Sequence, residues 1–475
     1  MLYSRFALGF FGMTLFFTGC NGGSAVPSPG AQPFVSSPGD IAQSLDIDAK
    51  AKQKIKHVII IVQENRSLNN LFMGYPGAKT VTYGYDSKNK RVPLKPIALE
   101  TRWDLAHNAS GVLKACHGTG SIPGTNCRMN GFDQEAVVLC GGAGQPKCPK
   151  DHPQYAYVPR TETEPYFDMA KNFVLADEMY SSDWDASSFV SHQYIIAAQA
   201  KSSVDYPDIN LQWGCPGGRT DKIGILAKNR TFPHGHEVVC WDVPTLGDEL
   251  DAAGLPWAYY ASAINGDGGI WSAYQTIKHI YKGPDWAQDV ISPQTQFFSD
   301  VKNGNLRSVS WITPTFENSD HAGSGSNTGP SWVASLVNAV GKSQYWDSSA
   351  IFVFWDDYGG WYDSRPPAYK DYDGLGFRLP LLIVSPYAKR GWVSHVQYEH
   401  GSILRFIEDQ FGLSSLSVSD ARATSPQKDC FDFSKPARAF VPIKSPMDEN
   451  FFLHQPPDGR LPDSDSRPHW RHLRC

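Results

Sequence analysis

The segment from His57 to Phe72 constrains the fold more than any other part of the sequence. Residues 58–62 are all β-branched and apolar, and the run ends abruptly at Gln63-Glu64-Asn65-Arg66. Such a run is typical of a strand buried on both faces of a parallel sheet, and open α/β sheets bind ligands at the carboxyl ends of their strands. Because a carboxylate and a carboxamide both offer oxygen to a hard cation, we interpret Glu64 and Asn65 as metal ligands. The alternative is that one of them only caps the next helix.

A second stretch repeats this pattern. Residues 350–355 are apolar and lead directly into Asp356 and Asp357, and a Gly-Gly turn follows at 359–360. Two adjacent carboxylates repel each other unless a cation neutralises them. Two strands of one sheet that each end in paired oxygen donors predict a single metal site, with the ligands Glu64, Asn65, Asp356 and Asp357.

The rest of the chain alternates between strand patterns and helix patterns. Further strands are predicted at 257–261, 309–313 and 378–386, and further helices at 245–253 and 402–411. This alternation predicts an α/β fold, a three-layer αβα sandwich around a mostly parallel central sheet. Residues 75–165 are rich in Gly, Pro and Cys and have little periodicity, so we interpret them as an inserted loop region.

Three serines lie near the start of one predicted helix. Residues 166–179 have helix-like spacing, and a second helical pattern that extends to Ala200 begins near Ser187, Ser188 and Ser191. A hydroxyl there lies beside free backbone N–H groups and the positive end of the helix dipole, a place suited to an anion. It can attack phosphate if a cation lowers its pKa. The alternative is that one of these serines only caps the helix.

Two histidines lie close to acidic residues. His321 follows the predicted strand at 309–313 and is preceded by Asp320, whereas His107 lies in the inserted loop region near Asp104. A single histidine in a loop is usually a surface residue. The position of His107 in a loop therefore does not, on its own, indicate a function for this residue.

The first 50 residues predict export. Arg5, an apolar run at 6–17 and Thr18-Gly19-Cys20 have the order of an export signal, which we place at 1–20. The apolar run is too short to span a bilayer. Its end resembles a bacterial lipoprotein processing site with Cys20 as the lipidated residue and membrane anchor, and plain secretion is the alternative. Residues 21–50 are interpreted as a flexible linker to a domain at 51–475.

The net charge and the cysteine content limit the possible partners and the possible cellular compartment. The formal net charge is −5 and there is no Lys-rich or Arg-rich run, so we expect no nucleic acid partner. Without Cys20 eight cysteines remain, an even number that suggests disulfides in an exported protein. Cys140 with Cys148, or Cys116 with Cys127, could staple one long loop. No pair has the C-x-x-C spacing of structural zinc sites.

Taken together, these motifs resemble the bacterial phosphoesterase family that contains phospholipases C and acid phosphatases, whose fold is similar to that of alkaline phosphatase. The resemblance covers roughly residues 55–415. It rests on five blocks: 57–72 with its Gln-Glu-Asn-Arg-Ser core, 188–195, Asp320-His321, 355–363 with its Asp-Asp-x-Gly-Gly turn, and 378–408.

The resemblance implies a role for each block. The Glu-Asn and Asp-Asp pairs would hold one divalent metal ion, and their oxygen ligands suit Ca²⁺, Mg²⁺ or Mn²⁺. Ser188 would be the catalytic nucleophile, with Ser187 as the alternative because a misalignment by one position would exchange them. His321 would be catalytic and Asp320 substrate-binding, as the family's Asp-His pair. His107 is similar to an earlier histidine that contacts phosphate.

One position departs from the family's pattern. After the Gly-Gly turn the family continues with an aromatic residue, Tyr, Asp and His, whereas this chain reads Trp361-Tyr362-Asp363-Ser364. His395 and His400 are candidates to compensate for Ser364. Because the presumed metal ligands and nucleophile are all present, we expect an active enzyme.

The resemblance therefore implies a hydrolase of phosphoric esters that acts through a phospho-serine, and the N-terminal signal predicts its export. Its substrate would be a phospholipid, as for a phospholipase C, or a phosphate monoester, as for an acid phosphatase. The predicted membrane anchor and the 13% of aromatic residues favour a lipid slightly. A hypothesis from a different class is a lipid-anchored protein that binds phosphorylated solutes without turnover.

Overall fold

The computed structural model describes residues 54–185, 187–207, 213–266, 268–457 and 459–460. The chain divides into two units, residues 1–44 and 45–475, and all of the described residues belong to the second unit. The predicted export signal and linker, with Cys20, lie outside the described residues, and so does Cys475.

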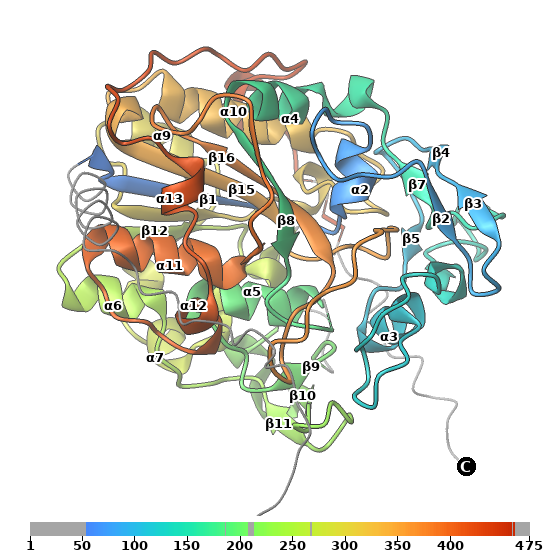
Figure 1. The fold of residues 1–475 in the computed structure, drawn as a ribbon. Coiled ribbons are helices and arrows are strands. Elements are labelled where there is room, and N and C mark those ends of the chain that lie inside the picture. Colours follow the sequence, from blue (N-terminus) through green and yellow to red (C-terminus); the bar gives the residue numbers. More distant parts are fainter. Residues whose placement is uncertain (1–53, 186, 208–212, 267, 458, 461–475) are drawn as a thin grey trace, which may run out of the picture. The chain divides into compact units, whose positions relative to one another are not determined.

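A nine-stranded sheet runs through the described domain (Figure 1). The strand order is β13-β12-β14-β1-β15-β16-β8-β17, and β18 also pairs with β8. Within this sheet β16 runs antiparallel to both of its neighbours, and the other pairings are parallel. The strands are β1 (His57–Gln63), β8 (Val174–Tyr180), β12 (Trp257–Tyr260), β13 (Val290–Ile291), β14 (Val309–Ile312), β15 (Ser349–Trp355), β16 (Arg378–Val384), β17 (Trp392–Ser394) and β18 (Tyr398–Glu399).

Helices cover both faces of this sheet. In Figure 1, α4, α9 and α10 lie on one face, and α5, α6 and α11 lie on the other. Because both faces are covered, β15 and β16 are buried along their whole length and β1 at all positions but its first, which is why these strands read as apolar runs. The predicted α/β class, with helices on both sides of a mostly parallel sheet, is confirmed.

The helices differ widely in length. The six that cover the sheet are α4 (Arg160–Asn172), α5 (Ser188–Ala197), α6 (Leu246–Ala252), α9 (Gln296–Lys302), α10 (Gly329–Gly341) and α11 (His400–Phe411). The others are α2 (Leu68–Phe72), α3 (Ala109–Cys116), α7 (Lys278–Lys282), α8 (Asp285–Gln288), α12 (Val418–Arg422), α13 (Gln427–Cys430) and α14 (Glu449–His454).

Strand β8 corrects one sequence interpretation. The helix-like spacing at 166–179 predicts a helix up to residue 179. In the structure α4 ends at Asn172 and β8 begins at Val174. Two acids in the middle of the strand, Asp177 and Glu178, interrupt the apolar pattern. Pairing with β16 on one side and β17 on the other outweighs this local signal.

The region at 75–165 forms small structures that are not part of the central sheet (blue to teal in Figure 1). They are β2 (Tyr83–Tyr85), β3 (Arg91–Pro93), β4 (Lys95–Pro96), β5 (Asp104–Leu105), α3, the 3₁₀ turn η1 (Phe132–Gln134), β6 (Val137–Val138) and β7 (Ala156–Tyr157). A separate three-stranded sheet follows later in the chain, with β9 (Ser203–Val204), β10 (Lys222–Ile225) and β11 (His236–Val238).

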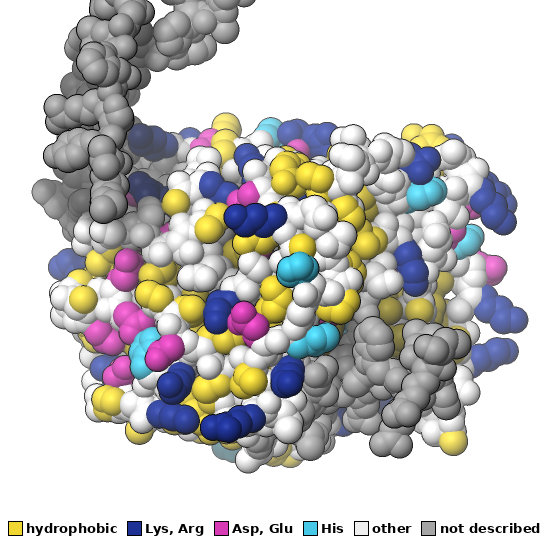
Figure 2. All heavy atoms as spheres, turned by 90° about the horizontal axis from the view of Figure 1, so that it is seen from below, with side chains coloured by type: hydrophobic (Ala, Val, Ile, Leu, Met, Phe, Trp, Pro, Cys, Tyr) yellow, Lys and Arg dark blue, Asp and Glu magenta, His cyan; other side chains and the backbone are white. Residues whose placement is uncertain are grey.

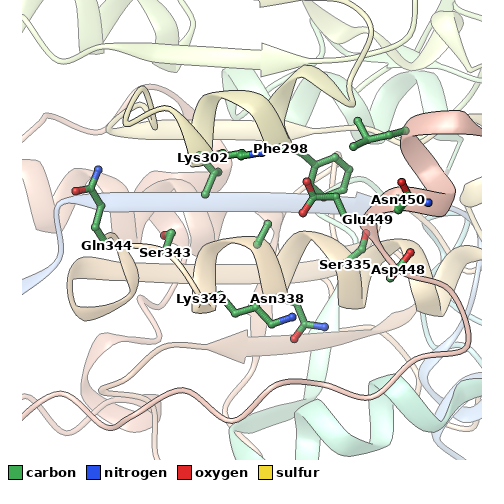
Figure 3. A pocket seen from close by; sticks show the side chains of 13 residues that line it. Phe298, Lys302, Ser335, Asn338, Lys342, Ser343, Gln344, Asp448, Glu449 and Asn450 are labelled. Carbon is green, nitrogen blue, oxygen red and sulfur yellow. The ribbon is translucent and has the colours of Figure 1, made fainter.

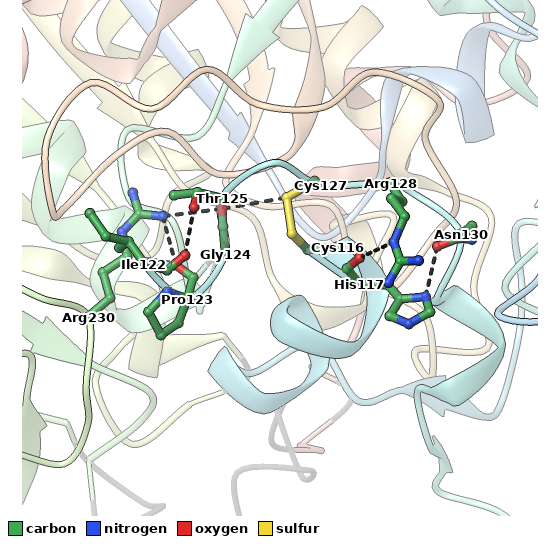
Figure 4. Close-up of a disulfide and its surroundings, with 10 residues drawn as sticks. All are labelled: Cys116, His117, Ile122, Pro123, Gly124, Thr125, Cys127, Arg128, Asn130 and Arg230. Atoms are coloured by element: carbon green, nitrogen blue, oxygen red, sulfur yellow. Dashed lines mark hydrogen bonds between the residues drawn. A yellow bond between two sulfur atoms is a disulfide. The ribbon is translucent and has the colours of Figure 1, made fainter. Parts of the chain in front are cut away.

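Three disulfides join parts of these peripheral structures. Cys116–Cys127 ties the end of α3 to the loop after it (Figure 4), and Cys140–Cys148 closes a second loop. Close spacing made both pairings possible in the sequence, and the structure contains both. Cys215–Cys240 staples the segment that carries β10 and β11, while Cys430 is a buried free thiol.

The surface gives little further indication of a partner. On the face shown in Figure 2, Lys and Arg side chains are dispersed among hydrophobic, polar and acidic ones. Within the described part of the chain, no helix has both the length and the apolar character needed to cross a bilayer.

Candidate active site

The parallel pairing of β1 with β15 brings the two predicted ligand pairs together. Gln63 lies opposite Trp355 in the register, so Glu64 and Asp356 follow at the same edge of the sheet. The backbone N–H of Asn65 donates to Asp356 Oδ1 over 2.9 Å, although the two residues are 291 positions apart in the sequence. Sheet register therefore assembles this part of the site.

Glu64, His192 and Asp356 form a cluster whose ligand atoms all lie within 4.8 Å of one another. His192 Nε2 is 2.9 Å from Glu64 Oε1 and 4.0 Å from Asp356 Oδ2. The three side chains are buried, and Asp356 Oδ2 has no hydrogen-bond partner among the described residues. A buried carboxylate oxygen without such a partner is costly. The donor set and this orphaned oxygen therefore fit a divalent cation.

His192 is the residue that sequence reasoning missed. It lies on α5, four residues after Ser188. Residues at this spacing project from the same side of a helix. The spacing from Ser188 is thus the signal in the sequence that could have identified His192 as a member of the site.

Ser188 is the first residue of α5, and its side chain faces the second acid of the Asp-Asp pair. Ser188 Oγ donates to Asp357 Oδ2 over 3.2 Å, while Asp357 Oδ1 accepts from the Gly359 N–H over 2.7 Å. Ser187, the N-cap residue, is directed elsewhere, because its hydroxyl is bonded to the Asp185 carboxylate and to the Asp205 carbonyl, at 3.0 Å each. The structure brings Ser188, not Ser187, to the acid pair.

The amide of Asn65 connects the acidic cluster with two histidines. Its oxygen accepts from His107 Nε2 over 2.6 Å and from His321 Nε2 over 3.2 Å. Its nitrogen donates to Glu64 Oε2 and Asp356 Oδ1, at 3.2 Å each. One side chain thus places the two predicted histidines against the predicted metal ligands.

Contacts on the far side of each ring fix the two histidines. His107 Nδ1 lies 2.6 Å from the Leu105 carbonyl, and His107 Nε2 lies 4.0 Å from Asp357 Oδ2. The His321 ring stacks on Trp271, with 6.0 Å between ring centroids, and its Nδ1 is 3.8 Å from Asp104 Oδ2. Asp104 is near His107 in the sequence, and the fold also places it beside His321.

Asp320 is the predicted site residue that the structure does not bring to this cluster. Its carboxylate accepts from the Tyr166 hydroxyl over 2.6 Å and from Trp355 Nε1 over 3.2 Å. Burial raises the pKa of this carboxyl to about 6. The carboxylate is therefore bonded to Tyr166 and Trp355, although Asp320 is next to His321 in the sequence.

The Glu-Asn-Arg-Ser motif also contains two structural residues. Ser67 caps α2 by accepting from the Asn70 N–H over 3.2 Å, so neither Glu64 nor Asn65 is the cap of that helix. Arg66 Nε donates to the Asp320 carbonyl over 2.8 Å, and burial lowers the pKa of this guanidinium to about 10.

Ser364 stands where the resemblance predicts a histidine, and both candidate substitutes have partners of their own. His395 pairs with Asp177 over 2.8 Å. His400 Nε2 lies 3.3 Å from the Trp355 carbonyl, and burial lowers the pKa of His400 to about 4.

A pocket of about 770 Å³ lies between α9, α10 and α14 (Figure 3). Lys302, Asn338, Lys342 and Glu449 are among its lining residues, and none of the 13 belongs to the cluster around Asn65. The candidate active site is therefore defined by converging side chains and not by this pocket.

Two curated proteins are similar in sequence to most of this chain. Hemolytic phospholipase C of Pseudomonas aeruginosa is 22% identical over 441 residues, which cover 80% of this chain and 56% of that protein. Non-specific phospholipase C1 of Arabidopsis thaliana is 22% identical over 452 residues, which cover 82% of this chain and 76% of that protein. The chain thus spans little more than half of the length of the Pseudomonas relative.

A solved structure and a family model complete the comparison. A protein in the alkaline phosphatase superfamily from Vibrio parahaemolyticus matches with 10% identity and a TM-score of 0.35, covering 84% of this chain and 79% of that one. The model of the Phosphoesterase family matches residues 55–414, which include every member of the cluster. The chain therefore belongs to the Phosphoesterase family, as the five sequence blocks predicted.

Proposed function

We propose that this chain is a metal-dependent hydrolase of phosphoric esters that acts through a phospho-serine on Ser188. The observation that carries the proposal is the position of the Ser188 hydroxyl, at the N-terminus of α5 and 3.2 Å from Asp357 Oδ2. Family membership and the phospholipase C relatives support the same reaction class.

The first half of the reaction depends on Ser188. Asp357 accepts the hydrogen bond of the Ser188 hydroxyl and so orients an oxygen lone pair away from itself. Attack on phosphorus forms the Ser188 Oγ–P bond, passes the hydroxyl proton to the Asp357 carboxylate and breaks the bond between phosphorus and the departing alcohol. The free N–H groups at the start of α5 favour the negative charge of the phosphoryl group.

The two histidines are positioned to donate protons and to contact the phosphoryl oxygens. His107 Nε2 and His321 Nε2 both point at the Asn65 amide oxygen, so each can donate to an oxygen atom at that position. One of them protonates the departing alcohol. Water then attacks the phospho-serine, which releases the phosphoryl product and restores the Ser188 hydroxyl.

Glu64, His192 and Asp356 would hold the metal ion, with Asp357 as a neighbouring ligand. Asn65 would join them only with its amide rotated, so that its oxygen and not its nitrogen faces Glu64 and Asp356. A divalent cation bound there would supply positive charge that lowers the pKa of the nucleophile and stabilises the phosphoryl oxygens. The imidazole of His192 shifts the expected preference from Ca²⁺ towards Mn²⁺ or Zn²⁺.

The substrate class follows from the relatives. Both relatives described above are named phospholipases C, which supports a phosphodiester lipid over a phosphate monoester. The three disulfides support an exported protein, because such bonds persist in oxidising compartments. Cys20 would anchor it to a membrane if the predicted lipoprotein signal is processed.

Hydrolysis of p-nitrophenyl phosphorylcholine and p-nitrophenyl phosphate tests the proposal. The purified protein is assayed with a chelator and then with added Ca²⁺, Mg²⁺, Mn²⁺ or Zn²⁺. We expect chelator-sensitive turnover, faster on the diester, and a covalent phosphoryl adduct on Ser188 in acid-quenched samples. No turnover with any metal, together with tight binding of phosphorylated solutes, would instead favour a binding protein.

A further inference from the structure

The His107 loop and the Ser188 loop come from separate parts of the chain, and one residue contacts both. His107 precedes α3, and Ser188 begins α5. Asp205, which follows β9, is hydrogen-bonded to a residue beside each of them. None of the motifs in the sequence includes Asp205.

Three contacts of Asp205 define this link, which we name the Asp205 bracket. Its side-chain Oδ1 accepts from the Ala109 N–H over 2.8 Å, at the first residue of α3. Its backbone N–H donates to Asp185 Oδ2 over 2.7 Å. Its carbonyl accepts from the Ser187 hydroxyl over 3.0 Å, and that hydroxyl is also 3.0 Å from Asp185 Oδ2.

The bracket acts on residues that lie next to the reacting groups. Ala109 is two positions after His107, and Ser187 directly precedes Ser188. A displacement of either loop would change the distance from the Ser188 hydroxyl to the histidine that faces Asn65 and Asp357. Catalysis is sensitive to such a change, since a misplacement of about 1 Å can cost on the order of a hundredfold in rate.

Asp205 directly follows a strand of the separate three-stranded sheet. It follows β9, which pairs with β10, and β10 pairs with β11 in the sheet stapled by Cys215–Cys240. Its φ of 65° lies in the left-handed region, which Asp and Asn tolerate better than other side chains apart from glycine. The neighbouring strand and the tolerance of Asp for this φ together favour the backbone conformation of Asp205.

We propose that Asp205 is a positioning residue that holds the His107 loop and the Ser188 loop at a fixed separation for phosphoryl transfer. The inference rests on the proposed function, because it assigns Asp205 to that same site. Asp205 acts through Ala109, Asp185 and Ser187 and does not touch the reacting atoms.

Two variants separate positioning from charge. Asp205→Asn keeps an oxygen that can accept from the Ala109 N–H and tolerates the left-handed conformation. Asp205→Ala removes the acceptor. A matched control is Asp86→Ala, since Asp86 also accepts backbone N–H groups, from Lys88 and Lys90, but in the turn between β2 and β3.

The kinetic test compares kcat and KM for p-nitrophenyl phosphorylcholine. We expect Asp205→Ala to lower kcat by about tenfold to a hundredfold with KM within about threefold of wild type. Asp205→Asn should keep kcat within about threefold, and Asp86→Ala should leave it unchanged. Wild-type kcat in Asp205→Ala, or equal losses in the Ala and Asn variants, would overturn the inference.

Hydrogen exchange tests the bracket without relying on turnover. In Asp205→Ala we expect the amides at 107–112 and 187–190 to exchange about tenfold faster than in wild type, with Asp205→Asn close to wild type. Unchanged exchange in Asp205→Ala would refute the bracket even if kcat fell. If the wild type hydrolysed no ester, the proposed function would fail, and the exchange rates would still decide whether Asp205 holds the two loops.

Discussion

Ser188 and Asp357 meet across the sheet edge, with the serine hydroxyl 3.2 Å from the Asp357 carboxylate, although 169 positions separate them in the sequence. The neighbouring Ser187 is bonded instead to Asp185 and Asp205. Of the two adjacent serines, Ser188 is therefore the one whose hydroxyl faces the acid pair.

Replacing Ser188 with alanine should abolish turnover, because it removes the hydroxyl that donates to Asp357 and is the proposed nucleophile. We expect kcat for p-nitrophenyl phosphorylcholine to fall by at least about a thousandfold. Ser187→Ala, the matched control, removes only bonds to Asp185 and Asp205 and should keep measurable activity. If Ser187→Ala were the inactive variant, the assignment of the nucleophile would be wrong.

Replacing His192 with asparagine should weaken metal binding while the fold persists. The imidazole Nε2 lies 2.9 Å from Glu64 Oε1 and supplies the nitrogen donor of the cluster. We expect the dissociation constant for Zn²⁺, measured by calorimetry, to rise by about tenfold or more, and that for Mg²⁺ to change less. His395→Asn serves as the control, since His395 pairs with Asp177 outside the cluster. Equal affinities for both metals in wild type and His192→Asn would exclude His192 as a ligand.

Gly359→Ala should disrupt the contact between the two metal-binding motifs. Gly359 has a φ of 62°, and an added Cβ would lie 2.1 Å from the Asn65 carbonyl oxygen. Gly144 has a similar φ of 76° but open space around the same position, so Gly144→Ala measures the backbone cost alone. We expect Gly359→Ala to lower the free energy of unfolding by about 2 kcal/mol more than Gly144→Ala does. Equal losses in urea unfolding would contradict the predicted clash.

Stability should depend on pH through Glu408 of α11. Burial, and next the neighbouring Asp420, raise the pKa of Glu408 to about 9 from an ordinary value of 4.5. The folded state therefore holds the proton more tightly, so this stabilising contribution is complete below pH 4.5 and is lost as the pH rises through about 9.

Glu408→Gln stays neutral and should remove this dependence. We expect the Tm of Glu408→Gln to match wild type near pH 4.5 and to exceed it by about 2 °C or more near pH 9. Exposed Glu100→Gln is the control and should follow wild type at both values. A constant difference in Tm between Glu408→Gln and wild type across this range would show that Glu408 is not protonated in the folded state.

The sequence allowed the central strands to be predicted where burial is complete. β1, β15 and β16 are covered by helices on both faces, so hydrophobic burial selects apolar residues at successive positions and leaves a pattern that can be read locally. The strand β8 could not be predicted in this way, because Asp177 and Glu178 interrupt the apolar pattern. The residues that bind these two acids come from distant segments of the chain.

The acid pairs and Ser188 could likewise be predicted, because each directly follows a strand or begins a helix. The spacing of His192 from Ser188 marks it as a candidate among the 14 histidines, but its contact with Glu64 exists only in the folded chain. Asp320 shows the converse, because adjacency to His321 in sequence did not place its carboxylate in the same cluster.

The strand ends, their oxygen donors and the family could be predicted from the sequence, because these depend on local burial patterns and on short motifs. Which residues meet at those strand ends depends on the fold. Parallel register joins Glu64 to Asp356, the helical turn from Ser188 adds His192, and Asp205 reaches both loops from a separate sheet. Those contacts join segments that are far apart in the sequence, so no local sequence pattern predicts them.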